Sequence, residues 1–169
     1  AAGERVLALI DEKPLFTDSE GARTLDNFHD KISFESVSFS YTDKVVLKNI
    51  SFTIPKGKTV ALVGPSGGGK STLMDLIPRF IQPASGQVLI DGINTRSITA
   101  ASLRSLMGVV NQDSILFNDS IFNNIAFARP GSTAEEVEAA AKIANAHEFI
   151  LGTEQGYATN IGDKGSKLS

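Results

Sequence analysis

The chain has 169 residues, with 16 Lys or Arg, 19 Asp or Glu and a formal net charge of −3. This length predicts one domain, or one domain with an extension. The absence of cysteine excludes disulfides, thiolate catalysis and cysteine-based zinc sites, and it fits a reducing compartment. The longest uninterrupted apolar run, residues 6–10, is too short to cross a bilayer. A slightly acidic chain without a basic stripe also argues against nucleic acid as the main partner.

The first forty residues change from a helical to a strand pattern. Residues 3–12 carry Val6, Leu9 and Ile10 on one helical face, and the residues from Thr17 to Asn27 form a polar linker. From Lys31 the apolar residues recur at every second position, which is typical of a strand. They form two sets (Ile32 and Phe34; Val37, Phe39 and Tyr41), and the slip between the sets predicts a bulge.

Further strands and helices are predicted along the rest of the chain. Strand patterns cover residues 45–54, 59–63, 88–90 and 108–112, and an Asp-Gly pair at 91–92 predicts a hairpin turn. Helices are expected at 71–80 (Leu73, Leu76 and Ile77 inward), from Thr99 to Leu106, after Thr133 and at 147–151. Thr133 and Glu136 have the spacing of a capping box. The run 59–63 has the pattern of a buried strand, and 108–112 is a second buried-strand candidate that ends in polar residues.

Residues 64–71, Gly-Pro-Ser-Gly-Gly-Gly-Lys-Ser, match the phosphate-loop pattern GxxxxGK[ST] at every fixed position. Glycines let successive backbone N–H groups point at one phosphate, and the following helix adds its free N-terminal donors. Lys70 would reach the β- and γ-phosphates, and the Ser71 hydroxyl would bind Mg²⁺. The alternative is a glycine-rich turn beside a surface lysine. Because the motif lies between a strand pattern and a helix pattern, we expect it to bind a nucleotide.

Beyond this loop, the chain resembles the ATP-binding domain of ABC transporters, and most closely the exporters that fuse a membrane domain to an ATPase domain. The residues that carry the resemblance are Val37–Tyr41, Gly64–Leu73, Ser85–Gly92, Leu103–Arg104, Val109–Asp113, Leu116–Phe117, Ile121–Ile125 and Gly156–Ser169. The resemblance implies an α/β fold of the P-loop NTPase type, with a RecA-like core, an N-terminal antiparallel β subdomain and a helical subdomain. It also implies that residues 1–24 are a linker from a membrane domain and that 25–169 belong to the ATPase domain.

The resemblance assigns the nucleotide site residue by residue. Tyr41 matches the aromatic residue that stacks on adenine, although a core tyrosine would fit the strand pattern too. Gln112 matches the glutamine that touches Mg²⁺ or the attacking water beside the γ-phosphate, and its alternative is a surface loop residue. Val46 is either an apolar wall for the base or a core residue. The implied ATP-binding set is Tyr41, Gly64, Pro65, Ser66, Gly67, Gly68, Gly69, Lys70, Ser71, Thr72 and Gln112, with Ser71 and Gln112 on Mg²⁺.

Two later segments resemble surfaces that face the rest of a transporter. Residues 114–125 are similar to the face that receives the coupling helix of the membrane domain, with an apolar patch at Ile115, Leu116, Phe117 and Ile121. Ordinary core packing is the alternative for these side chains. Asp163-Lys164-Gly165 matches a segment that couples the ATPase domains to the membrane part, and a solvated charged turn would fit it equally well.

Several family motifs have no match in the chain. The signature motif stops after Leu168-Ser169, and the Walker B aspartate, the general-base glutamate and the switch histidine are not found. Residues 7–12 and 88–91 imitate Walker B, but their contexts predict a linker helix and a hairpin. We assign no role to His29 or His147. We therefore predict no catalytic residue in the chain and negligible ATP turnover by it alone. The core sheet should be incomplete, so we expect the isolated chain to be marginally stable or to pair its open sheet edges with another chain.

The resemblance implies a function for the intact protein. It would couple ATP binding and hydrolysis to substrate transport, at the cytoplasmic face of a membrane, with a second ATPase domain in a head-to-tail dimer. One alternative is a module that binds nucleotide without hydrolysis. Another is a soluble ABC ATPase of DNA repair or translation. The linker-like residues 3–12 argue against this alternative.

Overall fold

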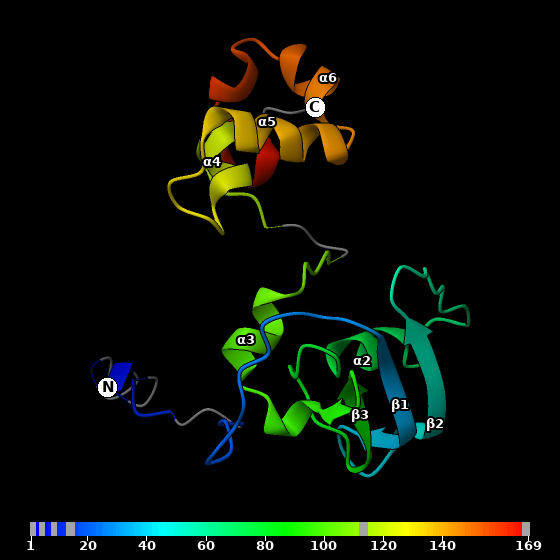
Figure 1. Ribbon diagram of the computed structural model, residues 1–169. Helices are drawn as coiled ribbons and strands as arrows, with labels where there is room; N and C mark the ends of the chain where they lie inside the picture. Colours follow the sequence, from blue (N-terminus) through cyan, green and yellow to red (C-terminus); the bar gives the residue numbers. More distant parts are fainter. Residues whose placement is uncertain (1–2, 4–5, 8–9, 13–15, 112–114, 167–169) are drawn as a thin grey trace. The chain divides into compact units, whose positions relative to one another are not determined.

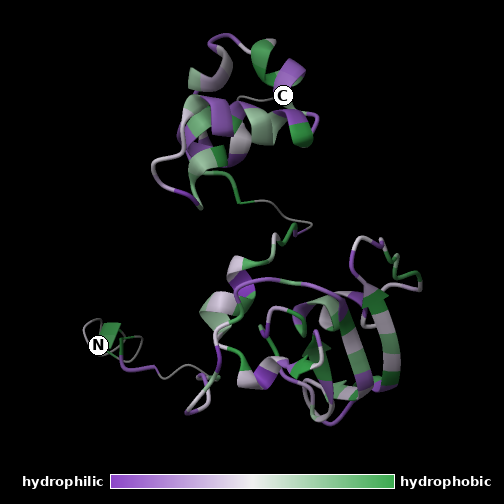
Figure 2. Ribbon diagram, viewed as in Figure 1, coloured by the Kyte–Doolittle hydropathy of each residue, from purple (hydrophilic) through white to green (hydrophobic). Residues whose placement is uncertain are grey.

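The computed structural model describes residues 3, 6–7, 10–12, 16–111 and 115–166, arranged in two units, Ala1–Val109 and Val110–Ser169 (Figure 1). The first unit is built on one antiparallel sheet with the strand order β2-β1-β3-β4. Its strands are β1 (Lys31–Ser40), β2 (Val45–Pro55), β3 (Ser85–Ile90) and β4 (Ile93–Asn94). The strands predicted from alternation, including the hairpin, are thereby confirmed. Figure 2 shows hydrophobic and hydrophilic residues alternating along β1 and β2.

The predicted bulge in β1 is also present. The register between β1 and β2 shifts between Phe34 and Val37, and Ser36 between them has a φ of 49°. The bulge lets Phe34, Val37 and Phe39 all point to the buried face, with exposed fractions of 8% or less. Without this extra residue the second apolar set would face solvent, because successive side chains in a strand alternate between its two faces.

Helix α2 (Lys70–Asp75) packs against this sheet and starts directly at the phosphate-loop motif. Leu73, Leu76 and Ile77 are buried with Phe34 and Val37, as predicted. The helix ends at Asp75, five residues earlier than the predicted end. Pro78 accounts for the early end, because it cannot donate a backbone hydrogen bond to Met74 and its ring clashes with that carbonyl.

The rest of the first unit is a short hairpin and a capped helix. Asp91 and Gly92 both have positive φ (52° and 80°), as a tight two-residue turn requires. After the 3₁₀ turn η1 (Thr95–Ser97) comes α3 (Ala100–Ser105), where the Thr99 side chain accepts from the Ser102 N–H as predicted. Ile90, Ile98 and Leu103 form a second small core.

The two predicted buried strands are not formed. Residues 59–63 and 108–111 have no regular secondary structure, and Val63 and Val110 are each 94% exposed. A strand exists only when its N–H and C=O groups find a neighbouring strand. Within the described part of the chain, neither segment has such a neighbour. The described sheet is therefore the antiparallel one alone.

The N-terminal residues follow the prediction where they are described. Gly3, Val6, Leu7 and Ile10 are helical and exposed. Residues 16–30 belong to the first unit and form one isolated bridge in it, between Arg23 and Ile98. Over the described ranges, no helix has the length and hydropathy needed to cross a membrane.

The second unit is helical. It contains α4 (Ile121–Ala126), α5 (Ala134–Ile143), α6 (His147–Leu151) and the 3₁₀ turns η2 (Gly156–Ala158) and η3 (Asp163–Gly165). Its core consists of Ile121, Ala141, Ile150 and Ile161. The capping box of Thr133 and Glu136 is confirmed, with both reciprocal hydrogen bonds present.

Candidate nucleotide-binding site

The phosphate-loop motif curls directly into the first turn of α2. Gly69 is the N-cap of the helix, with a φ of 82°, and its carbonyl accepts from the Leu73 N–H at 2.8 Å. The Gly68 N–H donates to the Pro65 carbonyl at 3.1 Å, which closes a turn over residues 65–68. This turn and the helix start bring the backbone donors of the loop to one end of α2, where N–H groups have no partner within the helix.

Both the backbone conformation at position 69 and the neighbouring side chains of β2 require a glycine there. A Cβ at this position would lie 2.8 Å from Leu47 Cδ2 and 3.2 Å from Val46 Cγ1, which belong to β2. Gly67 also has a positive φ, 75°, but open space surrounds it. The loop is therefore pressed against β2 at its helical end and open around Gly67, where a ligand would approach the backbone.

Lys70 spans the loop with its side chain. Its Nζ donates to the Gly64 carbonyl at 2.9 Å and to the Pro65 carbonyl at 2.7 Å. These bonds place a positive charge across the start of the loop rather than out in solvent. Ser71 is exposed in the first turn of α2, whereas Thr72 is buried. The geometry thus combines a cation, a free hydroxyl and backbone N–H groups, which is the chemistry that binds a phosphate chain.

Tyr41 lies beside this loop although it is 29 residues earlier than Lys70. Its hydroxyl is 3.3 Å from Thr72 Oγ1, and its ring packs edge-on against Phe39 with centroids 4.8 Å apart. The residue is 61% exposed, so the core-tyrosine alternative is wrong. One ring face is thus available next to the first turn of α2.

The predicted nucleotide-site residues that the structure describes all lie in the first unit. Gly64–Thr72 and Tyr41 come together in the first unit. Val46 packs against the main core cluster, which favours the packing interpretation. Gln112 lies outside the described residues. No pattern in the sequence marks Leu47 as a support of the loop, because only its long-range approach to Gly69 reveals that role.

Of the two segments that imitate Walker B, residues 88–91 have the hairpin role predicted for them. The Asp91 carboxylate accepts from the backbone N–H groups of His29, Asp30 and Lys31, at 2.7, 2.7 and 2.9 Å. Partial burial raises the pKa of this carboxyl, but the three hydrogen bonds outweigh it, so the pKa is lowered overall. Asp91 therefore fastens the start of β1 to the hairpin. Asp11 follows the exposed N-terminal helical residues.

The predicted apolar patch of the second unit is only partly a surface. Ile115 and Phe117 are exposed, by 82% and 42%, and the Phe117 ring stacks on Phe127 with centroids 4.3 Å apart. Ile121 is buried and Leu116 packs against the core, so the core-packing alternative holds for these two. Asn124 holds the Phe117 backbone through both its amide atoms, at 2.8 and 3.0 Å.

His147 and Asp163 have local partners. His147 Nδ1 lies 2.9 Å from the Tyr157 hydroxyl, and Asn118 donates to Asp163 Oδ1 at 2.9 Å. Across the described ranges, no three His, Asp or Glu side chains are grouped as a metal site would need. The strongest concentration of ligand-binding groups that the structure describes is therefore the loop from Gly64 to Thr72.

Comparison with known proteins agrees with this geometry. The family model described as "ABC transporter" matches residues 47–169. The "ATP-dependent lipid A-core flippase" of Syntrophus aciditrophicus (strain SB) is 47% identical over 169 residues, which are 100% of this chain and 28% of that protein. A Staphylococcus aureus (strain NCTC 8325 / PS 47) protein, named for ATP-binding and permease functions in multidrug export, is 49% identical over 97% of this chain and 29% of its own length.

Solved structures give the same result. The structure of a bacterial Atm1-family ABC exporter with ATP bound superposes with a TM-score of 0.90 and 43% identity, covering 99% of this chain and 29% of that one. The chain thus spans less than a third of the length of these relatives. The fold is that of a P-loop ATPase with its antiparallel and helical parts present, and the chain belongs to the ABC transporter family.

Proposed function

We propose that the chain is the ATP-binding part of an ABC exporter and that it holds ATP at the loop from Gly64 to Ser71. The observation that carries this proposal is the loop itself, whose backbone donors, glycines and Lys70 ammonium converge at the start of α2. A triphosphate is the ligand that uses all three, because its charge is spread over oxygens that accept several hydrogen bonds at once. The ABC transporter family uses ATP, which makes ATP the triphosphate to propose.

In this arrangement the Lys70 ammonium would neutralise the β- and γ-phosphates, and the N–H groups of residues 66–72 would bind their oxygens. Gly67 and Gly69 give the backbone the positive φ angles that turn these donors inward. The bound Mg²⁺ would take the exposed Ser71 hydroxyl and, by resemblance, Gln112. Since Mg²⁺ is usually held by few protein groups together with substrate phosphates, a single hydroxyl in the described site is compatible with an ion that arrives with the nucleotide.

Tyr41 would supply the contact to the base. Its exposed ring stands next to the first turn of α2 and is fixed on one side by Phe39 and at its hydroxyl by Thr72. A ring held in this way can stack on adenine at little entropic cost, for about 1 kcal/mol of binding free energy.

For the intact protein we infer ATP hydrolysis coupled to transport, in a protein that carries a fused membrane domain. The relatives' names, which describe a lipid A-core flippase and an ATP-binding/permease protein, support this inference. Residues 1–24 would then be the linker from the membrane domain, and the ATPase domain would face the cytoplasm and pair head to tail with a second one. The exposed Ile115 and Phe117 are the side chains that a coupling helix would cover.

A binding module without hydrolysis is the second candidate for the chain taken alone. The described residues near the loop include no carboxylate or histidine that we can assign to a catalytic role. We therefore expect the chain to bind ATP with negligible turnover. A turnover typical of ABC ATPases, measured on the chain itself, would overturn that expectation.

The binding site is tested by nucleotide titration, with calorimetry as the readout. We expect Lys70→Ala to abolish most ATP affinity, and Tyr41→Ala to weaken it by about fivefold, the equivalent of roughly 1 kcal/mol, while reducing the preference for adenine over other bases. Lys58→Ala, which removes an exposed lysine outside the loop, is the matched control and should bind as the parent does. Equal ATP affinity of Lys70→Ala and the parent would refute the phosphate site.

A further inference from the structure

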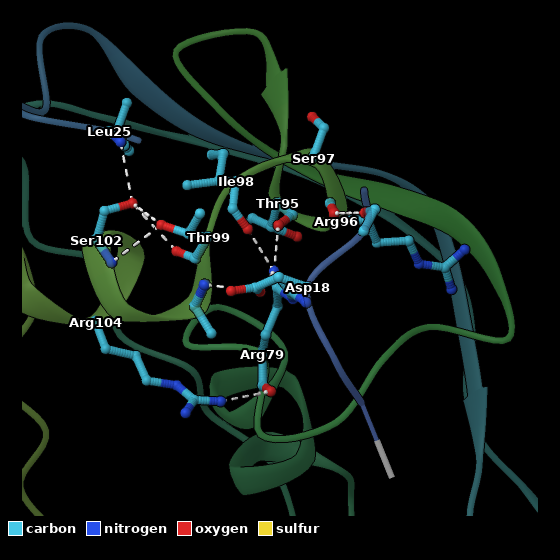
Figure 3. A network of polar contacts seen from close by, with 12 residues as sticks. Asp18, Leu25, Arg79, Thr95, Arg96, Ser97, Ile98, Thr99, Ser102 and Arg104 are labelled. Carbon is cyan, nitrogen blue, oxygen red and sulfur yellow. Dashed lines mark hydrogen bonds and ion pairs between the residues drawn. The ribbon is translucent and has the colours of Figure 1, made fainter. Parts of the chain in front are cut away.

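The segment from residue 16 to 30 is fastened to the rest of the first unit by a network of polar contacts, which Figure 3 shows. The Arg23 N–H donates to the Ser97 carbonyl and its own carbonyl accepts from the Thr99 N–H, both at 2.8 Å. The Leu25 N–H donates to Ser102 Oγ at 3.0 Å. This segment has no regular secondary structure of its own, so it is held by these contacts and by the packing of Leu25 and Phe28 against the second core.

The centre of the network is Arg79, four residues beyond the end of α2. Its side chain is 4% exposed, and its backbone has the unusual φ of 57°. The Nη1 atom donates to Asp18 Oδ1 and to the Thr95 carbonyl, each at 3.2 Å, and also to the Ile98 carbonyl. A guanidinium cannot lose its charge by deprotonation, so its burial requires an anionic or strongly polar partner. Asp18 supplies that anion from the N-terminal segment.

Three further hydrogen bonds tie Asp18 and the backbone at residues 78–79 to α3. The Asp18 Oδ1 atom also accepts from the Ala100 N–H at 2.9 Å. Arg104, from α3, donates to the Pro78 and Arg79 carbonyls at 2.8 and 3.0 Å. The chain leaving α2 is therefore fixed by α3 through its carbonyls and by the N-terminal segment through its side chain.

The other end of α2 is the phosphate loop. A helix of six residues is about 9 Å long, so Lys70 and the turn that leads to Arg79 are separated by little more than that length. Leu73, Leu76 and Ile77 fix the intervening part of the chain in the core. A short element that is held at one end has less conformational freedom to lose when a ligand orders its other end.

We propose that Asp18 and Arg79 are a positioning pair that couples attachment of the N-terminal segment to nucleotide binding at α2. The proposal rests on the proposed function, because it needs the loop to bind ATP. Both events order the same helix, so each strengthens the other. The coupling is reciprocal: ATP tightens the hold on residues 16–30, and loss of that hold weakens ATP binding by the same factor.

Trypsin cleavage after Arg23 measures the attachment in the full chain. A protease needs an extended, detached segment, and the backbone of Arg23 is hydrogen-bonded on both sides while the segment stays in place. We expect Asp18→Ala to accelerate this cleavage and ATP to slow it in the parent. Asp26→Ala removes an exposed acid from the same segment and is the matched control, expected to match the parent in both measurements.

The readout that separates coupling from simple support is the ATP dissociation constant. We expect Asp18→Ala to raise it by about fivefold, at the lower end of usual coupling between two sites, and to reduce the protection by ATP at Arg23. Asp18→Glu, which keeps the charge, should recover part of both effects. If Asp18→Ala fails to fold, both measurements are made on Asp18→Asn, which keeps the side-chain shape.

Three outcomes overturn the proposal. Cleavage at Arg23 that does not accelerate in Asp18→Ala or Asp18→Asn shows that the pair does not hold the segment. Faster cleavage with an unchanged ATP dissociation constant, or parent cleavage that ATP does not slow, leaves the pair a structural support only. A parent chain that binds no ATP refutes the proposed function together with this inference, whereas the first two results leave the nucleotide site intact.

Discussion

The replacement of Gly69 by alanine tests how the phosphate loop is seated on the sheet. The added Cβ would lie 2.8 Å from Leu47 Cδ2, closer than real Cβ atoms approach, and 3.4 Å from the Val46 carbonyl. Leu47 is 5% exposed and packed in the main core, so it has little room to move away. The left-handed backbone costs alanine about 1 kcal/mol and the overpacking about 2 kcal/mol, so we expect the free energy of unfolding to fall by about 3 kcal/mol.

Gly67→Ala is the control for this experiment, because it shares the positive φ but has open space around it. It should cost only the backbone part, about 1 kcal/mol. The assay is urea unfolding of both variants and the parent, followed by circular dichroism, with equal slopes of free energy against urea concentration as a check on the comparison. If the two variants lose the same stability, the close seating of Gly69 on β2 is refuted and only its backbone conformation matters.

Four further predictions follow from particular contacts. Gly86→Ala, whose Cβ would lie 2.3 Å from the Glu35 and Ser36 carbonyl oxygens, should lower the unfolding free energy by more than 3 kcal/mol, whereas Gly92→Ala, with a similar φ in open space, should cost about 1 kcal/mol in the same urea assay. The lowered pKa of Asp91 means that its contribution to stability is present above the unfolded-state pKa of about 4 and is lost as the pH falls through the folded-state pKa. Urea titrations between pH 6 and 3 should therefore show a smaller loss of stability on acidification for Asp91→Asn than for the parent, and equal losses would contradict the role of its three backbone partners. Thr133→Ala should cost about 1 kcal/mol by removing the capping hydroxyl of α5, while Thr133→Ser should stay within a few tenths; a thermal melt of each variant decides this. The chain on its own should self-associate through residues 59–63 and 108–111, so light scattering should find Val63→Lys and Val110→Lys less associated than the parent, and a monomeric parent with a cooperative melt would contradict this expectation.

Predictions from sequence succeeded where neighbouring residues decide the structure. The bulge in β1 follows from the slip between Phe34 and Val37, and the turn at Asp91-Gly92 follows from two residues that tolerate positive φ. The caps at Thr99 and Thr133 follow from hydroxyls that reach the N–H three residues later. Each of these features needs only a few consecutive residues, so the pattern in the chain is sufficient to specify it.

Predictions failed where the structure of a segment depends on residues far away in the sequence. Residues 59–63 have the apolar character of a buried strand, yet Val63 is exposed because no described strand lies beside it. The burial of Arg79 could not be predicted either, since its partners Asp18, Thr95 and Ile98 lie between 16 and 61 residues away. An arginine near the end of a predicted helix ordinarily stays in solvent, whereas here the path of residues 16–30 brings Asp18 to the buried cation.

The seating of Gly69 also explains why the phosphate loop keeps its shape although the strand predicted before it is not formed. The helical half of the loop is set by Gly69 against β2 and by the core around Leu73 and Leu76, all within the antiparallel sheet and α2. The first half is held by the turn from Pro65 to Gly68 and by the two bonds that Lys70 makes to Gly64 and Pro65. Of residues 59–63, Leu62 also packs against this core, but the hydrogen bonds and the close approach of Gly69 to β2 do not involve the segment. Pairing of that segment with another strand would therefore add support to a binding loop that the rest of the first unit already shapes.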